Sequence, residues 1–169
     1  GMFWGTEMTE LADCCLPGEY LTSIGDFAYA SCNNLTKVDL SVYPFLVATG
    51  DGSFANCKKL KKVVLPDNGL YKKTSKNMFR SGFFTGMATG SSSYKSAIEE
   101  IDFGGVEELG EFCFATCNEK ADDVGGTKAT DVWPSSLERL DLKGSNVMKI
   151  GKGAFKGNLG LKTAHFELV

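Results

Sequence analysis

A repeat of about 24 residues constrains the fold of this 169-residue chain more than any other feature. The segments 24–40 and 49–65 carry glycine, an aromatic residue, cysteine, leucine, valine and leucine at the same relative positions. Further copies, two of them divided by extra residues, lie at 109–142, at 150–166 and, more weakly, at 77–103. One such unit cannot bury its own apolar side chains, so the repeat predicts a stack of similar coils.

The spacing of the repeat predicts two insertions. The last apolar residues of the expected strands are separated by 24, 25, 38, 39 and 24 positions; they are Leu16, Leu40, Leu65, Phe103, Leu142 and Phe166. The two long intervals each contain about 14 additional residues at the same place in the unit. We therefore expect insertions at 83–97 and 118–133, on neighbouring coils.

Each unit combines a short strand with a compact turn. In the strand Val38-Asp39-Leu40 the two apolar residues are expected to face inward and Asp39 outward, because burial alternates along a strand. Pairs such as Ala28-Tyr29 predict a tight helical or 3₁₀ turn on the opposite side. The glycine after Ile24 fits a backbone that needs positive φ or a close approach. The units predict a single domain over residues 1–169, with about five coils and a partial N-terminal one.

These residues resemble the BspA-like leucine-rich repeats, whose unit runs from an apolar residue and glycine through Ala-Phe, cysteine and leucine to Leu-Pro. The resemblance covers about residues 11–169 apart from the insertions, although Gly82 and Asn158 replace the family cysteine. It implies a right-handed α/β solenoid with a short parallel β-sheet on the concave face. Short helical or 3₁₀ turns and loops are implied on the other side.

Composition disfavours several classes of function. The net charge is −3 and the pI is about 5.2, whereas nucleic-acid binders present basic surfaces. No apolar run reaches the roughly 18 residues of a membrane span. The chain has one histidine, which disfavours a histidine-based catalytic set or a multi-histidine metal site. We therefore expect no catalysis, no cofactor, no metal and no nucleic-acid partner.

The six cysteines have two interpretations. Cys32, Cys57 and Cys117 share one position of the repeat, which favours a column of buried thiols that act as small hydrophobic side chains. Neighbouring coils are expected to lie roughly 5 Å apart, so a disulfide between adjacent members also fits the geometry. Cys15 differs, because its position in the strand is expected to face outward.

The outward positions of the strands form the first candidate binding surface. They place an acidic row beside a row of mixed charge: Lys37, Asp39, Lys62, Val64, Glu100, Asp102, Arg139, Asp141 and His165. One interpretation is a protein-binding face on which complementary charge selects the partner. The other is a solvated sheet face stabilised by favourable cross-strand pairs. The sequence does not choose between them.

The insertions form a second candidate surface. Phe83 and Phe84 in the first and Trp133 in the second are candidates for exposed apolar contacts, and loops on a rigid scaffold often carry binding. The alternative is a pair of insertions without function, since longer surface loops destabilise a fold only slightly.

The resemblance also implies a function. It indicates a secreted or surface-attached protein, bacterial or protist, that binds other molecules rather than transforming them. We therefore expect an extracellular, non-enzymatic binding or adhesion module for a protein or glycan of a host or neighbouring cell. The alternative is a structural spacer within a larger surface protein. A secretion signal is expected to precede these residues, and the final strand 166–169 favours one segment of a longer solenoid.

Overall fold

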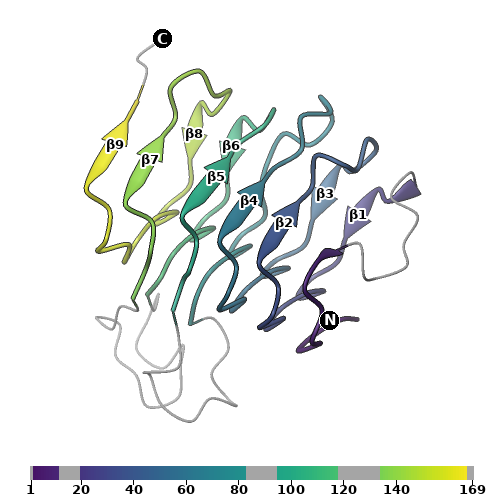
Figure 1. Cartoon of the computed structure of the whole chain (residues 1–169). Coiled ribbons are helices and arrows are strands. Elements are labelled where there is room, and N and C mark those ends of the chain that lie inside the picture. Colours follow the sequence, from purple (N-terminus) through teal and green to yellow (C-terminus); the bar gives the residue numbers. More distant parts are fainter. Residues whose placement is uncertain (1, 12–19, 83–94, 118–133, 167–169) are drawn as a thin grey trace.

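The computed structural model describes residues 2–11, 20–82, 95–117 and 134–166. These residues form short parallel strands that follow one another in a stack of coils, with the N-terminal and C-terminal coils at opposite ends (Figure 1). Each full coil contains a three-residue strand, a two-residue strand or a single bridge, and a turn. The stack therefore has two strand sides and one turn side around a common core.

The three-residue strands form the first row, with the order that the repeat predicts. They are β2 (Lys37–Asp39), β4 (Lys62–Val64), β5 (Glu100–Asp102), β7 (Arg139–Asp141) and β9 (Thr163–His165). β4 pairs with both β2 and β5, and β7 pairs with β9. Val38 and Leu40 are fully buried while Asp39 remains partly exposed, which confirms the predicted alternation.

The sequence did not predict a second row of strands. It contains β1 (Ser23–Ile24), β3 (Ala48–Thr49), β6 (Glu108–Leu109) and β8 (Lys149–Ile150). β1 pairs with β3, β6 pairs with β8, and Lys73 makes a single bridge to Glu108. Two-residue strands are too short to show a period-two pattern, which explains why this row was missed.

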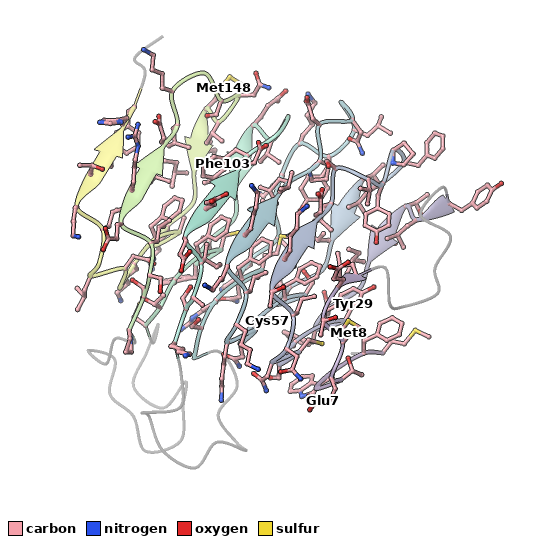
Figure 2. The ribbon with its side chains drawn as sticks, in the orientation of Figure 1. Glu7, Met8, Tyr29, Cys57, Phe103 and Met148 are labelled. Atoms are coloured by element: carbon pink, nitrogen blue, oxygen red, sulfur yellow. The ribbon has the colours of Figure 1, made fainter. Side chains whose placement is uncertain are left out.

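Stacked aromatic rings fill the turn side of the core. Six rings from consecutive coils lie with centroids 5.0 to 5.4 Å apart and with planes within 12° of parallel. They are Phe3, Tyr29, Phe54, Phe79, Phe114 and Phe155. Each such pair contributes about 0.5 to 1.5 kcal/mol beyond its buried area. The stack runs from the N-terminal segment to the last coil, so it connects every coil to its neighbours (Figure 2).

The turns are not helices. Ala28 N–H donates to the Gly25 carbonyl, three residues earlier, at 3.3 Å, and this separation in sequence is that of a 3₁₀ turn. The next N–H, that of Tyr29, instead donates to the Ser53 carbonyl of the following coil at 2.8 Å. One residue at the same position of each turn has positive φ, between 52° and 64°: Phe27, Gly52, Asn77, Phe112 and Gly153. A left-handed residue interrupts a right-handed helix. The described residues accordingly contain no α-helix, and the helical part of the predicted α/β class is not found there.

Glycines allow neighbouring coils to approach closely. Gly110 lies at the repeat position that follows the last residue of the short strand, and a Cβ added there would stand 2.4 Å from the Ser75 carbonyl oxygen. Gly50 and Gly151 occupy the same position and have equally little room. None of the three has positive φ. Close approach, rather than positive φ, is therefore the reason for glycine at these three positions, whereas Gly25 has neither feature within the described residues.

The cysteine column consists of buried thiols in the described residues. Cys57 Sγ donates to the Tyr29 carbonyl at 3.3 Å, in the preceding coil. Asn158 occupies the cysteine position of the last coil, and its amide donates to the Phe114 carbonyl at 2.9 Å. The asparagine thus keeps the donor that the thiol supplies elsewhere. Cys113 is also free and buried, and burial raises the pKa of its thiol to about 12.

Candidate interaction surfaces

The first-row strands bring nine of the predicted residues together on one side, which we call the strand face. The parallel register aligns Lys37 with Lys62 and Glu100, Asp39 with Val64 and Asp102, Arg139 with Thr163, and Asp141 with His165. β5 and β7 belong to separate sheets in the described residues. The face is therefore continuous within β2, β4 and β5, and separately within β7 and β9.

The charges on β2, β4 and β5 interact mainly with one another. Lys62 Nζ lies 2.8 Å from Glu100 Oε2, and this contact lowers the pKa of Glu100 and raises that of Lys62. Lys37 Nζ lies 2.7 Å from Asp39 Oδ2. Partial burial alone would raise the pKa of Asp39, but hydrogen bonds from Lys37 and Ser41 outweigh it and lower the pKa.

The β7 and β9 part of the face is arranged similarly. Arg139 Nη2 donates to Asp141 Oδ2 at 2.6 Å, and the pKa of Asp141 is lowered first by this bond and then by the Lys143 N–H. His165 Nδ1 lies 3.7 Å from the same carboxylate oxygen. Asp141 is thus the common partner of a cation on its own strand and of a titratable group on the neighbouring strand.

Phe83, Phe84 and Trp133 lie outside the described residues, as does the whole predicted insertion 118–133, but residues 95–97 and the residues on either side of 118–133 are described. Ser96 N–H donates to the Pro134 carbonyl at 2.9 Å, so the chain re-enters neighbouring coils side by side after each insertion. Regular pairing resumes at Ser96, which lies inside the predicted 83–97 boundary.

A buried arginine lies where both insertions begin. Arg80 is fully buried, and its guanidinium donates to the Cys117 carbonyl from Nη2 at 2.8 Å and from Nε at 3.1 Å. The same guanidinium lies 5.2 Å from the centroid of the Phe112 ring. Arg80 therefore ties the residue that precedes the second insertion to the coil that carries the first.

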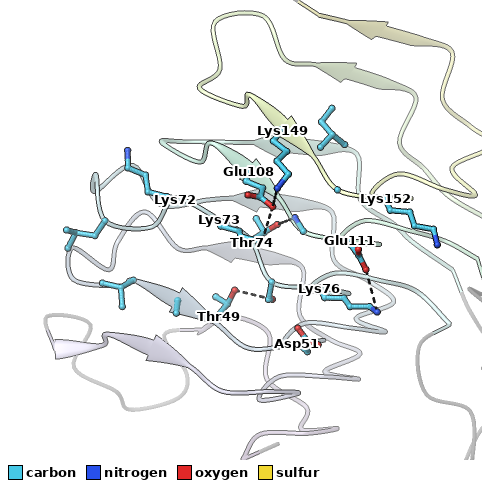
Figure 3. Close-up of a pocket in the computed structure, with 17 residues that line it drawn as sticks. Thr49, Asp51, Lys72, Lys73, Thr74, Lys76, Glu108, Glu111, Lys149 and Lys152 are labelled. Atoms are coloured by element: carbon cyan, nitrogen blue, oxygen red, sulfur yellow. Dashed lines mark hydrogen bonds and ion pairs between the residues drawn. The ribbon is translucent and has the colours of Figure 1, made fainter.

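A trough of about 840 Å³ crosses the second row of strands over four consecutive coils (Figure 3). Its floor contains Ser75, Gly110 and Gly151, at the repeat position where the coils approach most closely. Side chains on either side of this position form two walls. The inner wall is Lys73, Glu108 and Lys149, and the outer wall is Asp51, Lys76, Glu111 and Lys152. Small floor residues between long charged side chains produce the hollow.

The inner wall is organised around one carboxylate. Glu108 Oε1 lies 2.8 Å from Lys73 Nζ and 3.0 Å from Lys149 Nζ, and hydrogen bonds from these two lysines lower the pKa of Glu108. In the outer wall Lys76 Nζ lies farther from Glu111 Oε2, at 3.7 Å. The residues that line the trough include five lysines and three acidic side chains, so the trough is positive on a chain of net charge −3.

Backbone pairing is interrupted beneath the trough. No backbone hydrogen bond joins residues 47–49 to residues 71–75 within the described part of the chain. The backbone N–H of Glu108 donates to the Lys72 carbonyl, and the Glu108 carbonyl accepts from the Thr74 N–H. Because backbone groups alternate in direction along a strand, the N–H and C=O of Lys73, between these two residues, point away from β6 and toward β3. The side chain of Ser75 makes the connection instead, by donating to the Gly50 carbonyl at 2.6 Å. The second row is therefore split into two sheets.

The sequence matches the family described as BspA type leucine rich repeat region, with six copies over residues 6–120, which is more than half of the chain. The chain belongs to this family. A search of the curated proteins and a search of the solved structures returned no match.

In this leucine-rich-repeat chain, the strand face and the trough are each formed by residues at equivalent positions of successive coils. The strand face was predicted because three-residue strands show alternation. The trough was missed, although one signal was present: the position after the repeat glycine, which is Ser75 in one coil, is charged in four successive coils, as Asp51, Lys76, Glu111 and Lys152.

Metal sites and membrane spans are both absent from the described residues. No group of three or more His, Cys, Asp or Glu side chains is placed to hold a metal ion there. None of the described residues forms a helix of the length and apolar character needed to cross a membrane.

Proposed function

We propose that this chain is a non-enzymatic interaction module that binds a protein ligand through the strand face and the neighbouring insertions. In this proposal residues 1–169 form one right-handed leucine-rich-repeat solenoid. The observation that supports it is the strand face itself, on which parallel register holds charged side chains in regular rows. Exposed strand faces of repeat proteins commonly serve as extended binding surfaces.

The family supports the remaining parts of the proposal. A secreted or cell-surface location fits the association of these repeats with surface proteins. The proposed ligand is a protein, or alternatively a glycan, of a host or neighbouring cell. Electrostatic complementarity with the strand face would set its orientation and its rate of association.

The test is binding of the purified chain to candidate surface proteins and to a glycan array. In the test variant, Asp39, Asp102 and Asp141 are replaced by alanine. We expect the affinity to fall by about ten-fold or more, because these carboxylates of the strand face would attract and orient a ligand of complementary charge. The control replaces three exposed acidic residues that are not among the outward strand positions: Asp67, Glu99 and Glu138. Equal affinities of both variants for a ligand of the parent chain would refute the assignment of the strand face.

A structural spacer is the second candidate. It is favoured by the internal pairing of the strand-face charges, such as Lys62 with Glu100, because a solvated face has the same pairs. A spacer would bind nothing in the same assays, while flanking domains of the full protein retained the binding activity.

A further inference from the structure

We propose that the trough binds an extended acidic segment of a partner polypeptide. This goes beyond the strand face, because the trough lies on the other strand side of the coils and shares no lining residue with that face. It adds a second binding site to the proposed interaction module. It rests on the proposed function only because both require that the chain bind a polypeptide.

Charge is the first observation. Lys73 and Lys149 share a single carboxylate, that of Glu108, so the inner wall has one positive charge in excess. In the outer wall Lys76 and Lys152 stand beside Asp51 and Glu111, so this wall has no excess of either charge. A ligand carboxylate placed against the inner wall would therefore meet two ammonium groups that share a single carboxylate, and Lys152 stands on the opposite wall.

Size is the second observation. The lining residues belong to four consecutive coils, and coils are about 4.8 Å apart, which gives a length of about 14 Å. An extended chain rises about 3.3 Å per residue, so about four residues span the trough. Lys76 and Lys152 lie two coils apart, about 9.6 Å along this direction. Acidic residues three positions apart in a peptide, about 9.9 Å, would match that spacing.

The interrupted sheet is the third observation. The N–H and C=O of Lys73 face the gap between β3 and residues 72–74 and have no backbone partner within the described residues. Thr49 is the register partner of Ile24, and the Ile24 carbonyl accepts from the N–H of Gly50, the residue after Thr49. The backbone N–H and C=O of Thr49 therefore point away from β1 and toward the gap. A peptide that runs across the coils lies perpendicular to the strands, so it would meet these backbone groups singly and would not extend the sheet as an added strand.

The character of the lining favours a polypeptide over other ligands. Sites for small organic molecules are mostly apolar and enclosed, whereas lysine and glutamate side chains form the walls of this trough. No aromatic side chain is among the lining residues, so the trough has no flat apolar surface on which a sugar ring could lie. Charge and backbone groups together match an acidic peptide.

The experiment measures binding of a fluorescein-labelled peptide with glutamate at every third position and glycine between, about eight residues long, by fluorescence anisotropy at about 50 mM salt, where screening is modest. A peptide of glutamine and glycine is the reference. The test variant is Lys73→Gln, Lys149→Gln and Lys152→Gln together. We expect it to weaken binding of the acidic peptide by about ten-fold or more.

The matched control removes three positive charges from the strand face: Lys37→Gln, Lys62→Gln and Arg139→Gln. We expect it to leave the affinity of the peptide within about two-fold of the parent chain, because these charges are remote from the trough. An equal loss in both variants would overturn the proposal, since it would show attraction to net charge alone. Absence of peptide binding to the parent chain would overturn it as well.

A steric variant separates the shape of the trough from its charge. Ala48 is exposed on the trough, so Ala48→Trp narrows the trough without altering any ion pair. We expect the variant to fold as the parent chain does and to lose most peptide binding. Unchanged affinity would refute the role of the trough. A sulfated oligosaccharide that binds where the peptide does not would refute the polypeptide assignment and leave the strand-face proposal untouched.

Discussion

The strand face and the trough are built from the same coils but present their charges differently. On the strand face the floor between outward side chains is a regular sheet, and long side chains such as Lys62 and Glu100 lie across it and pair. In the trough the floor is a column of glycine and serine, so the charged side chains stand along two edges with space between them. A binding hollow in a repeat stack therefore depends on the smallest residues of the repeat as much as on the charged ones.

The largest expected effect tests the core that both surfaces share. Leu65 is fully buried, so Leu65→Asp would place an unpaired carboxylate between coils and is expected to destabilise the fold by about 4 kcal/mol or more. Asp39→Ala, on the outward side of the neighbouring strand, is expected to be nearly neutral. Urea unfolding monitored by circular dichroism measures both. Similar midpoints for the two variants would contradict the inward and outward assignment.

The next effect concerns pH. Burial raises the pKa of Cys57 and Cys113 above the ordinary value of 9.0, so the unfolded chain loses these protons at a lower pH than the folded chain. The contribution of these protonated thiols to the free energy of unfolding is therefore fully present below pH 9.0. At higher pH the free energy of unfolding decreases by about 1.4 kcal/mol per pH unit for each thiol. Unfolding free energies measured from pH 8 to about 10 test this. The double variant Cys57→Ala and Cys113→Ala should show a shallower decrease, and an identical slope would contradict the prediction.

An effect of intermediate size on stability is expected from glycine-to-alanine variants, which form a matched pair at one repeat position. Gly110→Ala would place Cβ 2.4 Å from the Ser75 carbonyl oxygen, and we expect a loss of about 1 to 3 kcal/mol from overpacking. Gly25 occupies the same repeat position, but a Cβ added there would meet no atom of the described residues within 4 Å, so Gly25→Ala should be neutral or slightly stabilising. Thermal unfolding compares them. Equal melting temperatures would show that close coil approach does not shape the floor.

The smallest effect is expected on the strand face. Lys62→Gln removes an exposed ion pair with Glu100, and such pairs contribute little to stability. The melting temperature should change by no more than about 1 °C, whatever the variant does to ligand binding. A large decrease would mean that the strand face has a structural role as well, which would weaken its interpretation as a binding surface.

Much of this architecture was predictable because burial leaves a pattern in the sequence. Val38, Asp39 and Leu40 show it directly, and their alternation predicted the strand face and its outward residues. The second row of strands was not predictable in this way, because Ala48 and Thr49 form a strand of only two residues whose pairing depends on the coil beside it. The trough depends on that row and on the gap beside Lys73, so its position follows from tertiary structure.

The turns show a different limit of sequence interpretation. Glycine at the left-handed position, as in Gly52 and Gly153, is the residue that this backbone favours. Phe27 and Phe112 hold the same positive φ, although bulky residues rarely do. A propensity argument would assign these phenylalanines to regular structure and predict a helical turn. Hydrogen bonds to the next coil, such as that from Phe112 N–H to Lys152 at 3.0 Å, impose the conformation instead.

The nearest-neighbour stacking of the coils also determines how the chain would respond to a pulling force. Each coil contacts only the coils beside it, so tension on the two ends would remove coils from the stack one after another. Successive strand markers 24 or 25 residues apart would release about 80 to 90 Å of extended chain per event. The intervals of 38 and 39 residues that contain the insertions would release about 130 Å each. The unequal repeat spacing would thus appear as two long steps among shorter ones in a force–extension record.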